Sequence, residues 1–471
     1  MHLALITTDY LVIGAGASAM AFVDTLLSED ADATVVMVDR EHRPGGHWNH
    51  AYPFVRLHQP SAWYGVASRE LASGDKDQVG PNAGLYSMAS GAEVLAHFEQ
   101  VMQQRFLPSG RVRWLAMSDY STAPDGTHRV RSLVSGQVQE VTVRRKVVDA
   151  THARTEVPAT HPPRYAVAAG VQCVPVNALT ATARPYASYT VVGSGKTGID
   201  ACLWLLAHGV EPARIRWIMP RDSWFMDRAN FQPGLENFEH NMAYSIGQFD
   251  AICAAASVPD LFERLEAQGA VLRLDPQVAP TSYRCATVSA HELVLLRQIE
   301  DVVRLGRVRT IEPDRIVLEQ GELPAQADTL YVDCSASAIQ LPPRLPVFDG
   351  ARINLFMIRF CQPLFSAALI ARVEALDGDD AEKNLLCQVV PSPVEPADWL
   401  RMWAVTLNKT MRWRQHPVLN AWLMNCRLNG QAVMARGLTP DDGPRLALLK
   451  ESGVKAAAAA ARLPSLVGAL A

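Results

Sequence analysis

The 471-residue sequence lacks several features that would assign it to a simple functional class. Its net charge is only −4, so no excess of basic residues points to nucleic acid or an anionic membrane as the main partner. No apolar run is long enough for a membrane span, and the residues before Tyr10 lack the pattern of a secretion signal. Residues 222–300 show no metal-ligand spacing. We therefore expect a cytoplasmic globular protein without membrane span, nucleic acid or resident metal.

The cysteines also lack an organised pattern. The eight of them are scattered, and none forms a C-x-x-C pair. A chain of this size can bury a full hydrophobic core without covalent cross-links, so we expect all cysteines to be reduced. The missing C-x-x-C pair also argues against a disulfide reductase.

Two glycine-rich turns are the most informative feature that the sequence does contain. Each turn leaves a hydrophobic strand and enters a helix. The first glycine permits the tight turn, the second lets a pyrophosphate approach the backbone at the helix N-terminus, and a small third residue packs helix against strand. Two such turns indicate two dinucleotides held at once, with electrons passing between them. The three positions are Gly14, Gly16 and Ala19 in the first turn, and Gly193, Gly195 and Gly198 in the second.

The residue at the end of the next strand distinguishes the two nucleotides. Asp39 follows the second strand of the first unit, and a carboxylate there can accept hydrogen bonds from ribose hydroxyls, as in FAD or NAD. No acid stands at the matching position of the second unit, where Arg221 can pair with a 2′-phosphate. The second site is therefore expected to bind NADP rather than NAD.

Lys196 and Thr197 follow the second pair of glycines and resemble part of a triphosphatase phosphate loop. That loop needs an earlier glycine where Thr190 stands, so the spacing excludes this interpretation. We expect Lys196 and Thr197 to contact the second dinucleotide instead.

The order of predicted elements indicates an α/β fold with two Rossmann-type dinucleotide-binding domains, the first interrupted by the second. We expect an FAD-binding domain in residues 1–160 that resumes in 331–385. An NADPH-binding domain is predicted for 161–330, with a mostly helical insertion at 222–300. A helical region at 386–471 completes the chain, and it either caps the active site or forms a homodimer interface.

Four segments, in order along the chain, resemble the class B flavoprotein monooxygenases, the NADPH-using flavin-containing kind. They are Asp39-Arg40 with Gly45-Gly46-His47-Trp48, the run Tyr52 to Pro60, the second glycine turn with Arg221 to Trp224, and the run Leu355 to Ser366. The resemblance implies FAD and NADPH as cofactors, with O2 and a small molecule as substrates. It also implies that Pro363 begins a helix whose N-terminal dipole faces the flavin.

The resemblance assigns roles to individual residues. FAD is expected to contact Gly14, Gly16, Ala19, Asp39, Arg40, Gly46 and Trp48, whereas NADP is expected to contact Gly193, Gly195, Lys196, Thr197 and Arg221. Three residues, Arg56, His58 and Gln362, are expected near the reacting ring as catalytic residues. Near neutral pH, the His58 imidazole could donate a hydrogen bond or carry a proton.

Several departures indicate a divergent member of the family. His58 stands where the family commonly has asparagine, Phe365 replaces a usual glycine, and the F-x-G-x-x-x-H fingerprint typical of Baeyer–Villiger enzymes is not evident. The main hypothesis is a monooxygenase that oxygenates an amine or sulfide through a C4a-(hydro)peroxyflavin. The alternatives are an NADPH-dependent flavin reductase or oxidase, and a nucleotide-binding protein without turnover.

Overall fold

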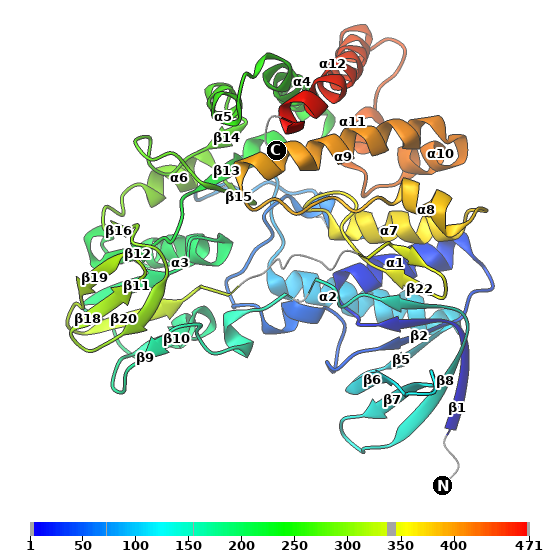
Figure 1. Cartoon of the computed structure of the whole chain (residues 1–471), viewed down its shortest axis with the longest axis horizontal. Helices are drawn as coiled ribbons and strands as arrows, with labels where there is room; N and C mark the ends of the chain where they lie inside the picture. The colour runs from blue at the N-terminus through cyan, green and yellow to red at the C-terminus, as the bar shows by residue number, and fades with distance from the viewer. Residues whose placement is uncertain (1–3, 72, 154, 337–344, 469–471) are drawn as a thin grey trace.

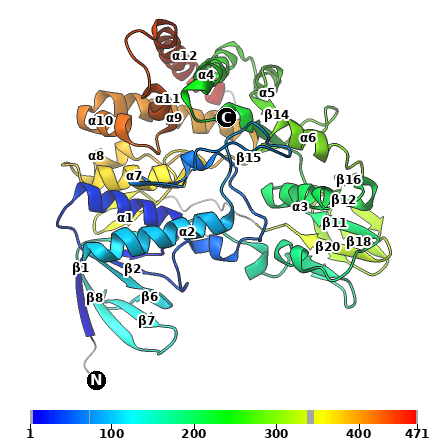
Figure 2. The ribbon, with the colours of Figure 1, turned by 180° about the vertical axis from the view of Figure 1, so that it is seen from behind.

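The computed structural model describes residues 4–71, 73–153, 155–336 and 345–468. Two large β-sheets lie on opposite sides of the molecule, and a layer of helices from the C-terminal part lies across the top of Figure 1. The view from behind places α1 (Ala17–Glu29) and α2 (Gly91–Val101) between the first sheet and this helical layer (Figure 2).

The first large sheet has the strand order of a Rossmann fold. Its parallel strands are β1 (Ala4–Ile13), β2 (Val35–Val38), β5 (Val112–Leu115), β8 (Val138–Asp149) and β22 (Arg352–Asn354). They follow the order β5-β2-β1-β8-β22, with β1 in the middle. Three short antiparallel strands complete it: β6 (Ser118–Thr122), β7 (His128–Ser132) and β21 (Phe348–Asp349). All four residues of β2 are buried, because Val35 and Met37 belong to the core under α1, whereas Val36 and Val38 pack with Val130 of β7 on the other face.

The second large sheet repeats this order. Its strands are β10 (Cys173–Pro175), β11 (Ser188–Val192), β12 (Ile215–Ile218), β16 (Val302–Val303) and β20 (Thr329–Asp333). All are parallel in the order β16-β12-β11-β20-β10, and α3 (Lys196–Ala207) follows β11. A smaller sheet flanks it, formed by β9 (Ala166–Val167), β17 (Val308–Ile311), β18 (Arg315–Leu318) and β19 (Gly321–Pro324). The predicted pair of Rossmann folds, the first interrupted by the second, is confirmed.

The insertion at residues 222–300 is mostly helical, as predicted, and it also contains a small sheet that the sequence did not reveal. It holds α4 (Phe238–Ala254), α5 (Val258–Ala267) and α6 (Ala290–Leu296). It also forms a three-stranded sheet of β13 (Ser223–Asp227), β14 (Val271–Leu272) and β15 (Ser282–Val288). These strands pair across long sequence separations, and β14 has only two residues, so no local periodicity of the sequence predicts them.

The C-terminal part is helical, as predicted. Its helices are α7 (Pro363–Glu374), α8 (Asp380–Leu386), α9 (Pro396–Gln415), α10 (Pro417–Asn425), α11 (Gly430–Ala435) and α12 (Gly443–Gly468). Helix α7 lies beside α1 over the first sheet. Helices α9 and α12 share a core with the insertion, in which Trp224, Phe262, Trp399 and Leu463 are buried. No helix within the described ranges is both long and apolar enough to cross a membrane.

Candidate active site

One cavity of about 840 Å³ connects the two Rossmann units. It is lined by Gly14 and Gly16 of the first glycine turn and by Lys196 and Thr197 of the second. Gln362, just before α7, lies on the same wall. Ligands of open α/β sheets bind beyond the carboxyl ends of the strands, where both turns lie, so a molecule held by either turn extends into this space.

The first turn has the backbone that its sequence predicts. Gly14 has φ +97°, a left-handed conformation that favours glycine, and Ala19 is fully buried in the core behind the turn. The Asp39 carboxylate at the end of β2 accepts hydrogen bonds from the backbone N–H groups of Ala15 and Glu41. Burial raises the pKa of this carboxyl against the opposing effect of these N–H groups. Asp39 therefore joins the turn to the strand end while lining the cavity.

The loop after β2 folds against the first turn. A Cβ atom on Gly46 would lie 3.0 Å from the Cα of Gly16, so the two backbones approach one another closely. The Trp48 indole donates a hydrogen bond to the Tyr64 hydroxyl at 2.9 Å and forms one wall of the cavity. Arg40 lies at the outer end of the same cavity with its guanidinium 3.6 Å from Asp119.

The second turn is tighter than the first. Gly193 has φ +128°, and a Cβ atom on Gly198 would lie 2.1 Å from the Gly193 carbonyl oxygen, so only glycine fits the third position. Gly195 has no heavy atom within 4 Å of an added Cβ, which leaves open space before the α3 N-terminus. This space suits a phosphate group.

Lys196 is not a free cation. Its ammonium group forms an ion pair with Asp200 one turn later on α3, and Asp200 also accepts a hydrogen bond of 2.6 Å from the Tyr52 hydroxyl. Sequence analysis missed Asp200, although its four-residue spacing from Lys196 on a helix is a recognisable signal. The ammonium group keeps further N–H donors for a ligand.

Arg221 belongs to a cluster that the sequence did not reveal. The pKa of Arg284 is lowered first by burial and then by the positive charges of Arg221 and Arg307. Arg221 follows β12, whereas Arg284 comes from β15 and Arg307 from the loop before β17. Within the described ranges, no carboxylate forms an ion pair with any of these three guanidinium groups. Such a cluster favours an anionic ligand.

All three predicted catalytic residues line the cavity. His58 is half-buried at the cavity surface, and burial, followed by the charges of Lys196 and Arg228, lowers its pKa well below the ordinary value. Its Nδ1 is buried and has no hydrogen-bond partner in the described part of the chain. The imidazole is therefore neutral near pH 7 and available to a bound molecule, which corrects the expectation that it could carry a proton there.

Arg228, which no sequence motif singled out, positions the His58 loop. Its guanidinium is buried and donates hydrogen bonds to the carbonyl oxygens of His58 and Thr287 and to Asn82, while pairing with Glu292 at 2.6 Å. This guanidinium therefore fixes the loop that carries His58 to β15 and α6 of the insertion.

The other two predicted catalytic residues, Arg56 and Gln362, make different hydrogen bonds. The Arg56 guanidinium donates to the Met88 carbonyl oxygen at 3.0 Å, so part of its hydrogen-bonding capacity is already used. Gln362 is the residue before Pro363, which begins α7 as predicted. Its carbonyl oxygen accepts a hydrogen bond from the Ser366 hydroxyl at 2.7 Å.

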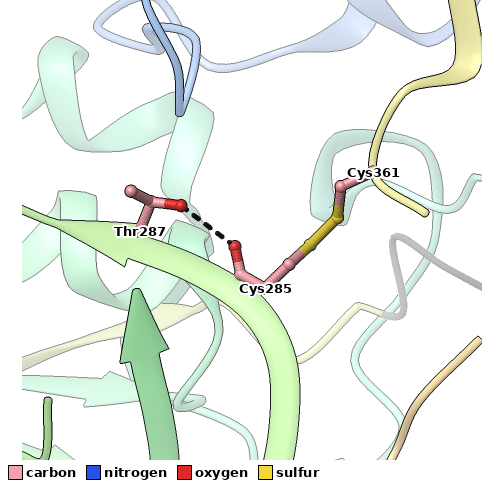
Figure 3. The surroundings of a disulfide bond; sticks show 3 residues. All are labelled: Cys285, Thr287 and Cys361. Carbon is pink, nitrogen blue, oxygen red and sulfur yellow. Dashed lines mark hydrogen bonds between the residues drawn. A yellow bond between two sulfur atoms is a disulfide. The ribbon is translucent and has the colours of Figure 1, made fainter. Parts of the chain in front are cut away.

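A disulfide between Cys285 and Cys361 also lines the cavity, so the expectation that all cysteines are reduced was wrong (Figure 3). The two residues are separated by 76 positions, and the fold brings β15 to the loop before α7. Sequence spacing alone could not pair them. The other six cysteines are free.

Comparison with solved structures defines the class of fold. A polycyclic ketone monooxygenase from the fungus Thermothelomyces thermophila superposes with a TM-score of 0.53 at 12% identity, covering 91% of this chain and 86% of that one. The open structure of a cyclohexanone monooxygenase gives a TM-score of 0.50 at 14% identity, covering 79% and 88%. The fold implied by the resemblance to class B flavoprotein monooxygenases is therefore confirmed.

Sequence relatives define the immediate family. Uncharacterized protein Rv2000 of Mycobacterium tuberculosis is 51% identical over 425 residues, which are 90% of this chain and 78% of that protein. Uncharacterized protein Mb2023 of Mycobacterium bovis matches to the same extent. The chain belongs to the family of these mycobacterial proteins. No family model matches the sequence.

Proposed function

We propose that this protein is an FAD- and NADPH-dependent monooxygenase that transfers one oxygen atom of O2 to a small nucleophilic substrate, an amine or a sulfide. The observation that carries the proposal is one cavity lined both by Gly14 and Gly16 of the first turn and by Lys196 and Thr197 at the start of α3. Electron transfer between two dinucleotides requires their reactive rings to meet in one space. The monooxygenase fold supports the same function.

The first unit fits FAD. Ala17 and Ser18, the first residues of α1, line the cavity, so the helix N-terminus faces the place where a pyrophosphate would lie. The Asp39 carboxylate lies where it can accept hydrogen bonds from ribose hydroxyls. Pro363, at the start of α7, lies on the same cavity wall, and the partial positive charge of this N-terminus would stabilise negative charge on the reduced ring.

The second unit fits NADPH. The open space at Gly195 accommodates a pyrophosphate before α3, and Lys196 keeps donors for it. The cluster of Arg221, Arg284 and Arg307 offers several guanidinium groups without a competing carboxylate. These groups suit the 2′-phosphate that distinguishes NADPH from NADH.

In this proposal the chain binds, orients and excludes water, while FAD, when bound, accepts the hydride of NADPH and activates O2. His58 contributes a neutral imidazole whose unpartnered Nδ1 can form a hydrogen bond with a bound molecule. Arg228 acts through His58 by fixing its backbone. Trp48 gives the cavity an apolar wall.

The test uses the FAD-loaded protein with NADPH, ¹⁸O2 and a panel of amines and sulfides. NADPH consumption, hydrogen peroxide and product mass are measured together. We expect a product that carries one ¹⁸O atom. His58→Ala should raise the peroxide released per NADPH, whereas His161→Ala, an exposed histidine that does not line the cavity, should leave this ratio unchanged.

A second candidate function is an NADPH-dependent reductase or oxidase without oxygen transfer. The disulfide on the cavity wall favours it, because it offers an electron acceptor other than O2. NADPH oxidation without any oxygenated product, for every substrate tested, would contradict oxygen transfer and support this candidate.

A further inference from the structure

Cys285 reaches the cavity through a distortion of its strand. In the pairing of β13 with β15, Trp224 stands opposite Tyr283 and Met226 stands opposite Thr287. Three residues of β15 therefore face a single residue of β13, and Cys285 is the middle one, with φ +55°. Such bulges redirect a side chain, and here the redirected side chain lines the cavity. Figure 3 shows it bonded to Cys361.

Cys361 reaches the same cavity from a segment that also has an unusual backbone conformation. It has φ +57° and stands two residues before Pro363, at the entrance to α7. Only four non-glycine residues in the described ranges have positive φ, and the disulfide joins two of them. Left-handed backbone is unfavourable for such residues and concentrates at functional sites.

The surroundings of Cys361 favour a reduced sulfur with negative character. The N-terminal dipole of α7 stabilises a thiolate at its entrance. Arg359, two residues earlier in the chain, is buried and has no carboxylate partner in the described ranges; its guanidinium lies over the Phe365 ring at 3.8 Å. These positive groups lie on the side of the disulfide that carries Cys361.

The disulfide lines the same cavity as Gln362, His58 and Lys196. Lys196 begins α3 directly after the second glycine turn. An electron acceptor at this point lies within the space where reducing equivalents from the second dinucleotide would arrive.

We propose that Cys285 and Cys361 form a redox-active disulfide that accepts two electrons supplied by NADPH through the flavin. The inference rests on the proposed cofactors and adds a second electron-accepting centre to them. One hydride from the nicotinamide supplies both electrons and the one proton that the step needs. The S–S bond breaks, Cys285 ends as a thiol and Cys361 as a thiolate, and one NADPH becomes NADP⁺.

The experiment uses the air-oxidised, FAD-loaded protein in the absence of oxygen. NADPH is added stepwise, flavin absorbance is recorded, and an alkylating agent then labels all thiols in denaturant for intact-mass counting. We expect six labels per chain before NADPH and eight after it, since six of the eight cysteines are free in the oxidised protein. Complete reduction should require twice as much NADPH as the flavin alone requires.

Variants and controls show which cysteines account for the additional NADPH. Cys285→Ser with Cys361→Ser should halve the NADPH needed for complete reduction. Cys253→Ser, a free cysteine on α4, should keep the wild-type requirement. Peptide mapping of the labelled wild-type protein should place both new labels on Cys285 and Cys361, so the test does not depend on the folding of any variant.

Three outcomes overturn the proposal, and they differ in what else they affect. Bleached flavin with six labels means that the disulfide is not an acceptor, while the proposed cofactors stand. Flavin that NADPH does not bleach contradicts the proposed function, and with it this route to the disulfide. Eight labels that appear only with an added dithiol, and never with NADPH, also reject it.

Discussion

The two Rossmann units have the same strand order but different chemistry at two equivalent positions. The third residue of the turn is Ala19 in the first unit and Gly198 in the second, where a Cβ atom would lie 2.1 Å from a carbonyl oxygen. The end of the second strand presents a carboxylate, Asp39, in the first unit and a guanidinium, Arg221, in the second. Shared topology creates two pyrophosphate sites, and single side chains at strand ends then distinguish the nucleotides.

The largest expected effect tests the turn position. Gly198→Ala should lower the free energy of unfolding by about 3 kcal/mol, because the added methyl group collides with backbone rather than with a flexible side chain. Ala19→Gly, the reverse change in the first unit, should cost only about 1 kcal/mol through helix propensity. Urea unfolding midpoints measure both.

Gly453→Ala is the matched control for added volume, since no heavy atom lies within 4 Å of a Cβ at that position on α12. It should be neutral or stabilise by up to about 1 kcal/mol. Equal midpoints for Gly198→Ala and Gly453→Ala would contradict the tighter second turn.

Substitutions of the strand-end residues should have a smaller effect, and this effect should differ between the two nucleotide sites. Arg221→Gln and Arg284→Gln should each raise the Kd for NADPH by about tenfold, equivalent to about 1.4 kcal/mol, and leave NADH binding unchanged. Asp39→Asn should weaken FAD retention without changing the ratio of NADPH to NADH affinity. Equilibrium binding measurements with each nucleotide provide the test.

Arg264→Gln, on the exposed face of α5, is the control for loss of a positive charge far from the cluster. If it weakens NADPH binding as much as Arg221→Gln does, the effect is one of overall charge. The assignment of the cluster to the 2′-phosphate would then fail.

The smallest expected effect is on the pH dependence of stability, and it concerns two histidines that line the cavity. Burial lowers the pKa of His47 to about 4, and burial together with Lys196 and Arg228 lowers that of His58 well below 6.5. The unfolded chain therefore binds more protons than the folded protein below pH 6.5, and stability falls as the pH falls through that value. The loss from His58 is at most about 1.4 kcal/mol per pH unit.

His58→Asn should flatten the decline of unfolding free energy between pH 7 and pH 5. His47→Asn should flatten it to a similar extent, because the folded-state pKa of about 4 also lies below this pH range. Denaturant unfolding at several pH values measures both slopes. An unchanged slope in His58→Asn would show that its imidazole is solvated and titrates normally.

Local sequence patterns predicted the parts of the site that a few consecutive residues create. The glycine turns, Asp39 after β2 and the start of α7 at Pro363 each depend on a strand-to-helix or loop-to-helix junction. Their conformations follow from residues within one turn of the chain, so a single sequence suffices to predict them.

Features that depend on tertiary packing escaped prediction. The Cys285–Cys361 bond needs a strand bulge and a loop 76 residues away, and neither has a local signal. Arg284 and Arg307 join Arg221 from separate strands and loops. The short strands of the insertion were missed for the same reason, since their pairing partners are distant in the sequence.

Because the second unit is inserted into the first, the order of translation also decides which strands can pair first. Strand β22 pairs with β8, yet residues 150–351, which include every strand of the second large sheet, lie between them. The edge of the first sheet therefore stays unpaired on a ribosome until the second unit has emerged. Folding of that unit brings its two ends together and shortens the loop that β22 must close. The first glycine turn is therefore translated first, although its nucleotide site is completed last.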